Sequence, residues 1–101
     1  MRAGGVPLRP DTIRDLWAHA EGYLATAERE LDPGGIRRGL LALAVAGSGG
    51  DDEGYRARVL EVRRVARKIG MDPVPLFDAA AAIVDPADET ARAILITTPR
   101  E

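Results

Sequence analysis

The sequence predicts an all-α fold, a compact single-domain bundle of about five short helices. Three observations lead to this prediction. Apolar residues recur at spacings of four and three along most of the chain, which places them on one face of a helix. Proline, glycine and aspartate interrupt this pattern where helices would end and restart. The length of 101 residues suits one domain with its own core. The expected helices span residues 11–31, 36–46, 54–69, 75–84 and 86–97.

The chain before the first expected helix, residues 1–10, is rich in glycine and proline. It is expected to be a flexible N-terminal arm, and the helical domain is expected to span residues 11–98. Asp11 or Thr12 is expected to cap the first helix, with Trp17 on its core face. The sequence Asp32-Pro33-Gly34-Gly35 is then expected to end that helix.

The longest apolar run, Leu40–Ala46, fits either a buried helix or a buried strand. Leucine and alanine favour a helix, and only residues 93–98 otherwise have strand character, which is too little for a sheet. We therefore predict a helix. The run is far shorter than the roughly 20 residues of a membrane span. Together with the absence of cysteine and of a signal peptide in the sequence, this favours a cytoplasmic protein.

Charge is distributed unevenly although the formal net charge is only −2. Residues 55–70 carry six basic side chains against one glutamate, whereas residues 72–101 carry six acidic side chains against two arginines. The simplest interpretation is that the later helices lie beside the basic helix and neutralise it. All basic residues except Lys68 are arginine, and alanine and glycine are abundant, a composition typical of a GC-rich bacterial genome.

The basic helix also carries the candidate partner-binding site. Leu60 lies about 140° from the core face of the helix, among arginines, and such a residue is either a scattered exposed leucine or the centre of a protein-binding surface. We predict a non-enzymatic protein–protein interaction module, a homodimer or an accessory subunit. The predicted partner-binding residues are Arg56, Leu60, Arg63, Arg64 and Arg67.

A DNA-binding helix-turn-helix regulator is the alternative. Val65, Ala66, Ile69, Gly70 and Leu76 have the spacing that lets two helices cross in such a motif. The second helix, however, offers Asp78 and alanines and no basic side chain to phosphates, so nucleic acid is an unfavourable partner.

No catalytic residue, metal site, cofactor or small-molecule ligand is predicted. The glycine-rich loop Gly47–Gly54 lacks the lysine of a phosphate-binding loop, and Asp51, Asp52 and Glu53 are adjacent, so that they point in different directions rather than toward one cation. His19 is the only histidine. A boundary histidine bonded to Asp15 or water is a simpler interpretation of it than a general base.

Overall fold

The computed structural model describes residues 8–100 and confirms the all-α prediction. Most of the expected flexible arm, residues 1–7, lies outside this range. Five α-helices and one short 3-10 helix make up the described part of the chain, which contains no strand. They are α1 (Pro10–Glu30), α2 (Pro33–Ala46), α3 (Asp52–Lys68), α4 (Pro73–Ala81), α5 (Glu89–Thr97) and η1 (Thr98–Arg100).

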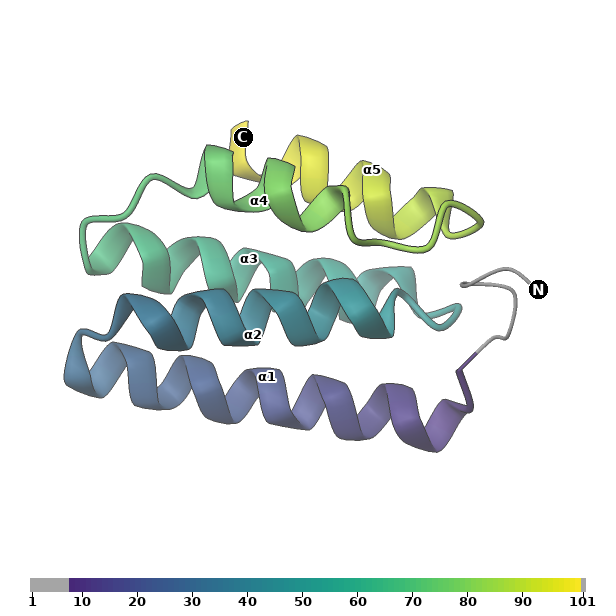
Figure 1. The fold of residues 1–101 in the computed structure, drawn as a ribbon, viewed down its shortest axis with the longest axis horizontal. Coiled ribbons are helices and arrows are strands. Elements are labelled where there is room, and N and C mark those ends of the chain that lie inside the picture. The colour runs from purple at the N-terminus through teal and green to yellow at the C-terminus, as the bar shows by residue number, and fades with distance from the viewer. Residues whose placement is uncertain (1–7, 101) are drawn as a thin grey trace.

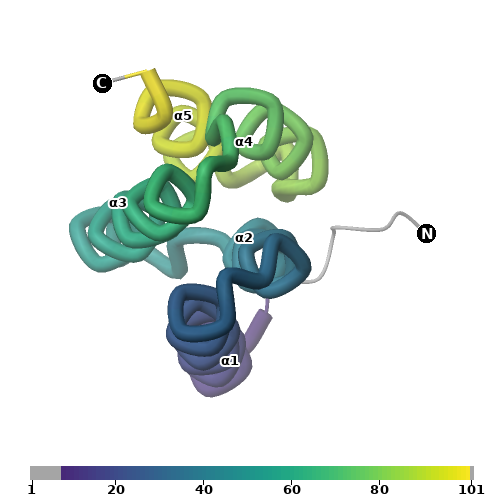
Figure 2. The backbone as a smooth tube through the Cα atoms, turned by 90° about the vertical axis from the view of Figure 1, so that its left-hand side faces the viewer, coloured from purple at the N-terminus to yellow at the C-terminus, as the bar shows by residue number. Residues whose placement is uncertain are grey.

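The helices form a bundle in which α1, α2 and α3 run along the long axis (Figure 1). Seen end-on, α1 lies at one edge, α2 and α3 side by side in the middle, and α4 and α5 at the opposite edge (Figure 2). Helix α3 contacts each of the other helices. Its buried side chains, Tyr55, Val59, Val62, Val65 and Ala66, therefore form the centre of the core.

The connection between α1 and α2 differs from the prediction. Leu31, not a glycine, takes the left-handed conformation that ends α1, and Gly34 and Gly35 already belong to the first turn of α2. Asp32 caps α2 by accepting a hydrogen bond from the Gly34 N–H. A Cβ atom on Gly35 would lie 2.8 Å from the Ala27 Cβ. The glycine thus allows α1 and α2 to pack closely.

Two helix starts also need correction. Helix α1 begins at Pro10 and its N-cap residue is Arg9, so neither Asp11 nor Thr12 is the cap. Helix α5 begins at Glu89 and not at Pro86, because Asp85 accepts from the Ala87 N–H within a separate turn and Asp88 caps the helix through the Ala91 N–H.

The run Leu40–Ala46 is helical, as predicted, and most of its side chains are buried within α2. Trp17 is buried on α1, also as predicted. Among residues 8–100 no helix combines the length and the apolar character needed to cross a bilayer.

Candidate functional site

Four of the five predicted partner-binding residues recur along α3 at spacings of four, three and four, which places them on one stripe. This set, Arg56, Leu60, Arg63 and Arg67, is called the outer stripe of α3. Leu60 is 40% exposed. Arg63 donates from Nη1 to the Thr98 carbonyl oxygen at 2.9 Å, and Arg67 donates from Nη2 to the Pro99 carbonyl oxygen at 3.3 Å. The fold thus ties two of the arginines to η1.

Arg64 points to the other side of α3. It donates to Glu28 of α1, at 2.9 and 3.1 Å, and to Glu61 at 2.6 and 2.8 Å. Hydrogen bonds from Arg64 and Lys68 lower the pKa of Glu28 to about 2, and the two glutamates raise the pKa of Arg64. Arg64 therefore serves the packing of α3 on α1.

For three cations of the basic helix, the carboxylates found among residues 8–100 are not those expected from the sequence. Carboxylates of α1 pair with it: Glu28 with Arg64 and Lys68, and Glu21 with Arg58 at 3.2 Å. The described end of the acidic part contributes carbonyl oxygens of η1, which accept from Arg63 and Arg67. Within residues 8–100 the ion pairs of the structure include neither Arg63 nor Arg67. The acceptors of these two arginines in the described part of the chain are neutral carbonyl groups.

The corner between α3 and α4 has the geometry of a plain helical turn. Gly70 has a φ of 84°, and the Met71 N–H donates to the Ala66 carbonyl oxygen at 2.8 Å. The only charged side chain of α4 is Asp78, which pairs with Arg100 at 3.4 Å. The helix that would enter a DNA groove in the alternative interpretation therefore carries no cation.

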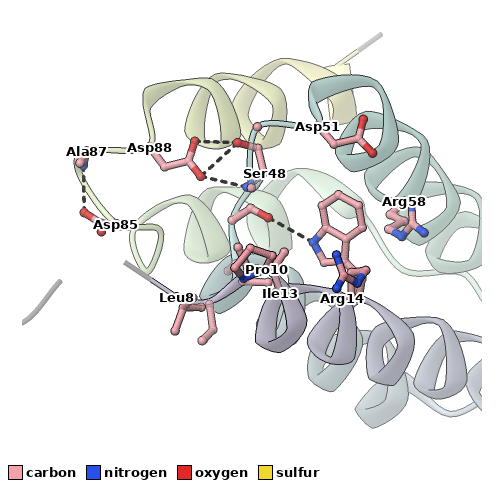
Figure 3. A pocket seen from close by; sticks show the side chains of 17 residues that line it. Leu8, Pro10, Ile13, Arg14, Ser48, Asp51, Arg58, Asp85, Ala87 and Asp88 are labelled. Atoms are coloured by element: carbon pink, nitrogen blue, oxygen red, sulfur yellow. Dashed lines mark hydrogen bonds between the residues drawn. The ribbon is translucent and has the colours of Figure 1, made fainter. Parts of the chain in front are cut away.

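A cleft of about 760 Å³ lies at the other end of the bundle, where the α2–α3 loop meets the turn before α5 (Figure 3). Four parts of the chain line it: the start of α1 with Leu8 before it, the run from Ala44 in α2 to Asp51 in the following loop, Arg58 of α3, and the turn from Asp85 to Asp88. Its apolar lining includes Ile13, Trp17 and Ala44. The lining combines this apolar surface with carboxylates.

Hydrogen bonds hold Trp17, which lines the cleft, and Tyr55, which is buried next to Trp17. Trp17 donates from Nε1 to the Gly47 carbonyl oxygen at 3.1 Å, and the Arg58 guanidinium lies 4.3 Å from the Trp17 ring centroid. Behind Trp17, the Tyr55 hydroxyl donates to the Leu43 carbonyl oxygen at 3.1 Å. Burial, and secondarily the negative charge of Asp88, raise the pKa of Tyr55. The negative charge of Asp88 thus contributes to keeping the buried Tyr55 hydroxyl protonated.

The glycine-rich loop lies at the cleft, whereas His19 does not. Gly47–Asp51 lines the cleft, and Asp51 caps α3 by accepting from the Gly54 N–H at 2.9 Å. His19 is exposed on α1 and does not line the cleft. Within residues 8–100 no three histidine or acidic side chains are grouped closely enough to hold a metal ion.

Sequence reasoning missed the cleft because its lining residues come from the start, the middle and the last quarter of the chain, from Leu8 to Asp88. The one local indication of a site was the glycine-rich loop from Gly47 to Gly54. Without knowledge of its contacts with Trp17 and Asp88, this loop is interpreted as a solvated turn. Comparisons of the chain with protein-family models, with curated protein sequences and with solved structures give no match. The geometry of the described residues is therefore the basis on which a function is assigned.

Proposed function

We propose that this chain is a non-enzymatic protein-interaction module that binds its partner through the outer stripe of α3. The observation that supports the proposal is the pair of hydrogen bonds from Arg63 and Arg67 to η1, which hold two arginines of the stripe one and two helical turns after the exposed Leu60. A guanidinium has five N–H donors, so one bond to a carbonyl fixes its position and leaves donors for a partner. Arginines held in this way lose less entropy on binding.

The charge of the stripe indicates the chemistry of the partner. Carboxylates on the partner would pair with Arg63 and Arg67, and an apolar side chain would cover Leu60. A two-fold dimer through this stripe would place like charges opposite one another, which is unfavourable. An acidic protein partner fits better than a second copy. Self-association and a cytoplasmic location, both expected from the sequence, stay predictions.

The proposal is tested with Leu60→Asp and a matched control, Leu41→Asp. Leu41 lies on α2 and is 47% exposed, close to the 40% of Leu60, so both variants place a carboxylate at a similarly exposed leucine. The immobilised chain captures candidate partners from an extract of the source cells, and each is then purified and titrated against the variants. The Arg63→Ala/Arg67→Ala double variant is titrated in parallel.

We expect Leu60→Asp and the double arginine variant to lower the affinity for a purified partner at least about tenfold, and Leu41→Asp to leave it unchanged. Light scattering of the same samples shows whether the partner is a second copy. Unchanged mass together with unchanged capture in Leu60→Asp would contradict the proposal. Strong binding to duplex DNA that weakens steeply with salt would support the DNA-binding alternative instead.

A further inference from the structure

The cleft at the end of the bundle has the size and composition of a small-molecule site. Its volume of about 760 Å³ lies within the range of roughly 300–1,000 Å³ that is usual for ligand pockets. Four separate chain segments form it, so the fold of the whole domain creates its shape. It lies apart from the outer stripe of α3, none of whose residues lines it.

The apolar surface of the cleft is held in place by one hydrogen bond and by close packing. The bond from Trp17 Nε1 to the Gly47 carbonyl oxygen fixes the indole ring, whose residue is only 7% exposed. Ile13 lies next to Gly49, where a Cβ atom would come within 3.1 Å of Ile13 Cγ2. These residues give a ligand an apolar surface whose ordering costs little on binding.

The cations that line the cleft have ion-pair partners, whereas its carboxylates have none among residues 8–100. Its two cations already have carboxylate partners: Arg14 pairs with Asp11, and Arg58 pairs with Glu21. Its three carboxylates, on Asp51, Asp85 and Asp88, take part in none of the ion pairs found between residues 8 and 100.

The carboxylates accept hydrogen bonds from neutral donors instead. Asp51 accepts from Gly54, Asp85 from Ala87, and Asp88 from Ser48 and from Ala91 at the start of α5. Helix dipoles offset part of the charge of Asp51 and Asp88, which cap α3 and α5, whereas Asp85 caps only a turn. The cleft therefore favours a cation over an anion.

We propose that the cleft binds a small organic amine, with the apolar body of the ligand against Ile13 and Trp17 and its ammonium group toward the carboxylates of the rim. The apolar contact provides most of the affinity, and the carboxylates select the positive charge. The same arrangement disfavours carboxylate and phosphate ligands, since these would meet like charge.

Trp17 provides the measurement, because it is the only tryptophan in the chain. Its fluorescence is followed while the chain is titrated with 2-phenylethylamine, with neutral 2-phenylethanol and with anionic 3-phenylpropionate, which share one apolar body. We expect saturable binding of the amine, about tenfold tighter than the alcohol and weaker still for the acid, with the preference declining at high salt.

The variant Asp51→Asn/Asp85→Asn tests the role of charge without loss of capping, because asparagine is as good a capping residue as aspartate. Asp72→Asn is the matched control: Asp72 caps α4 by accepting from the Val74 N–H, and it does not line the cleft. We expect the double variant to weaken amine binding about fivefold and the control to leave it unchanged.

Two results would overturn the proposal. If none of the three compounds gives a saturable Trp17 response, the cleft is not a ligand site. If the three bind equally, or if amine affinity survives in Asp51→Asn/Asp85→Asn, the selection for a cation is wrong. Neither result bears on the outer stripe of α3, because none of the residues of that stripe lines the cleft.

Discussion

Asp88 accepts hydrogen bonds from both the backbone N–H and the hydroxyl group of Ser48, forty positions earlier in the chain, at 2.9 and 3.1 Å. The same carboxylate caps α5 through the Ala91 N–H. One side chain thus joins the α2–α3 loop to the start of α5 and closes one side of the cleft. The cleft therefore depends on a contact between two segments that are distant in the sequence.

Asp88→Ala is expected to be considerably more destabilising than Ser48→Ala. The first change removes the α5 cap and leaves the buried Ser48 without its acceptor, which together cost about 2–4 kcal/mol. The second change removes only the hydroxyl group and costs about 1 kcal/mol. Urea denaturation of the two variants measures the difference. Equal midpoints would show that the contact does not hold the loop in solution.

Substitution of three glycines by alanine distinguishes the cost of a steric clash from the cost of a left-handed backbone conformation. Gly47 has a φ of 73°, and a Cβ atom there would lie 2.5 Å from Asp88 Oδ2. Gly50 has a φ of 83° with nothing within 4 Å, and Gly22 is an exposed residue inside α1 with nothing within 4 Å. We expect Gly47→Ala to be the most destabilising change and Gly50→Ala to cost about 1 kcal/mol. Gly22→Ala should stabilise the chain by about 0.5–1 kcal/mol.

Thermal unfolding of the three glycine variants gives their order of stability. The structure requires the order Gly22→Ala, Gly50→Ala, Gly47→Ala from most to least stable. If Gly47→Ala were as stable as Gly50→Ala, the close approach of the loop to Asp88 would be wrong.

Stability at acid pH is expected to depend on Glu28. Hydrogen bonds from Arg64 and Lys68 lower its pKa from an ordinary value near 4.5 to about 2, so the charged form is stabilised in the folded chain. A lowered folded-state pKa gives stability that is fully present above about pH 4.5 and is lost as the pH falls toward 2. The pKa of Glu61 is lowered by the same Arg64, so it adds in the same direction.

Glu28→Gln removes this titration. The difference in unfolding free energy between the native chain and Glu28→Gln should be constant above pH 5 and should shrink between about pH 4.5 and 2. High salt should reduce the difference, because the pairs are exposed to solvent. An NMR titration of the Glu28 carboxyl group that gives an ordinary pKa would exclude the ion-pair cluster.

The helices could be predicted because their information is local. The four-three spacing of Tyr55, Val59 and Val62 depends only on the helical repeat, and these residues are fully buried, as the pattern requires. Helix ends were harder to predict. Pro86 follows an aspartate as a first helical residue often does, yet Asp88 is the cap of α5, and its carboxylate also accepts from Ser48.

Contacts between distant segments could not be predicted from one sequence. The bond from Trp17 to Gly47 joins residues thirty positions apart. Among residues 8–100, the carboxylates on other helices that pair with Arg58, Arg64 and Lys68 come from α1 and not from the acidic C-terminal part. Net charge by segment indicates that opposite charges will meet, but not which helices carry them. The outer stripe of α3 was visible in the sequence because it is a property of one helix.

The end of α1 provides the last prediction. Leu31 has φ 54° and ψ 44°, the left-handed conformation that glycine adopts without strain, and it is 63% exposed. A leucine there costs roughly 1–2 kcal/mol of backbone strain relative to glycine, and little apolar burial compensates for it. Leu31→Gly should therefore raise the unfolding free energy, by less than the full strain because glycine also increases the entropy of the unfolded chain.

Gly70→Ala is the converse change at the end of α3, where φ is 84° and nothing lies within 4 Å of the added Cβ. It should lower the unfolding free energy by about 1 kcal/mol. Denaturation of both variants under one set of conditions measures the two effects. A decrease in stability for Leu31→Gly would mean that the side chain of Leu31 contributes more through packing than its left-handed conformation costs.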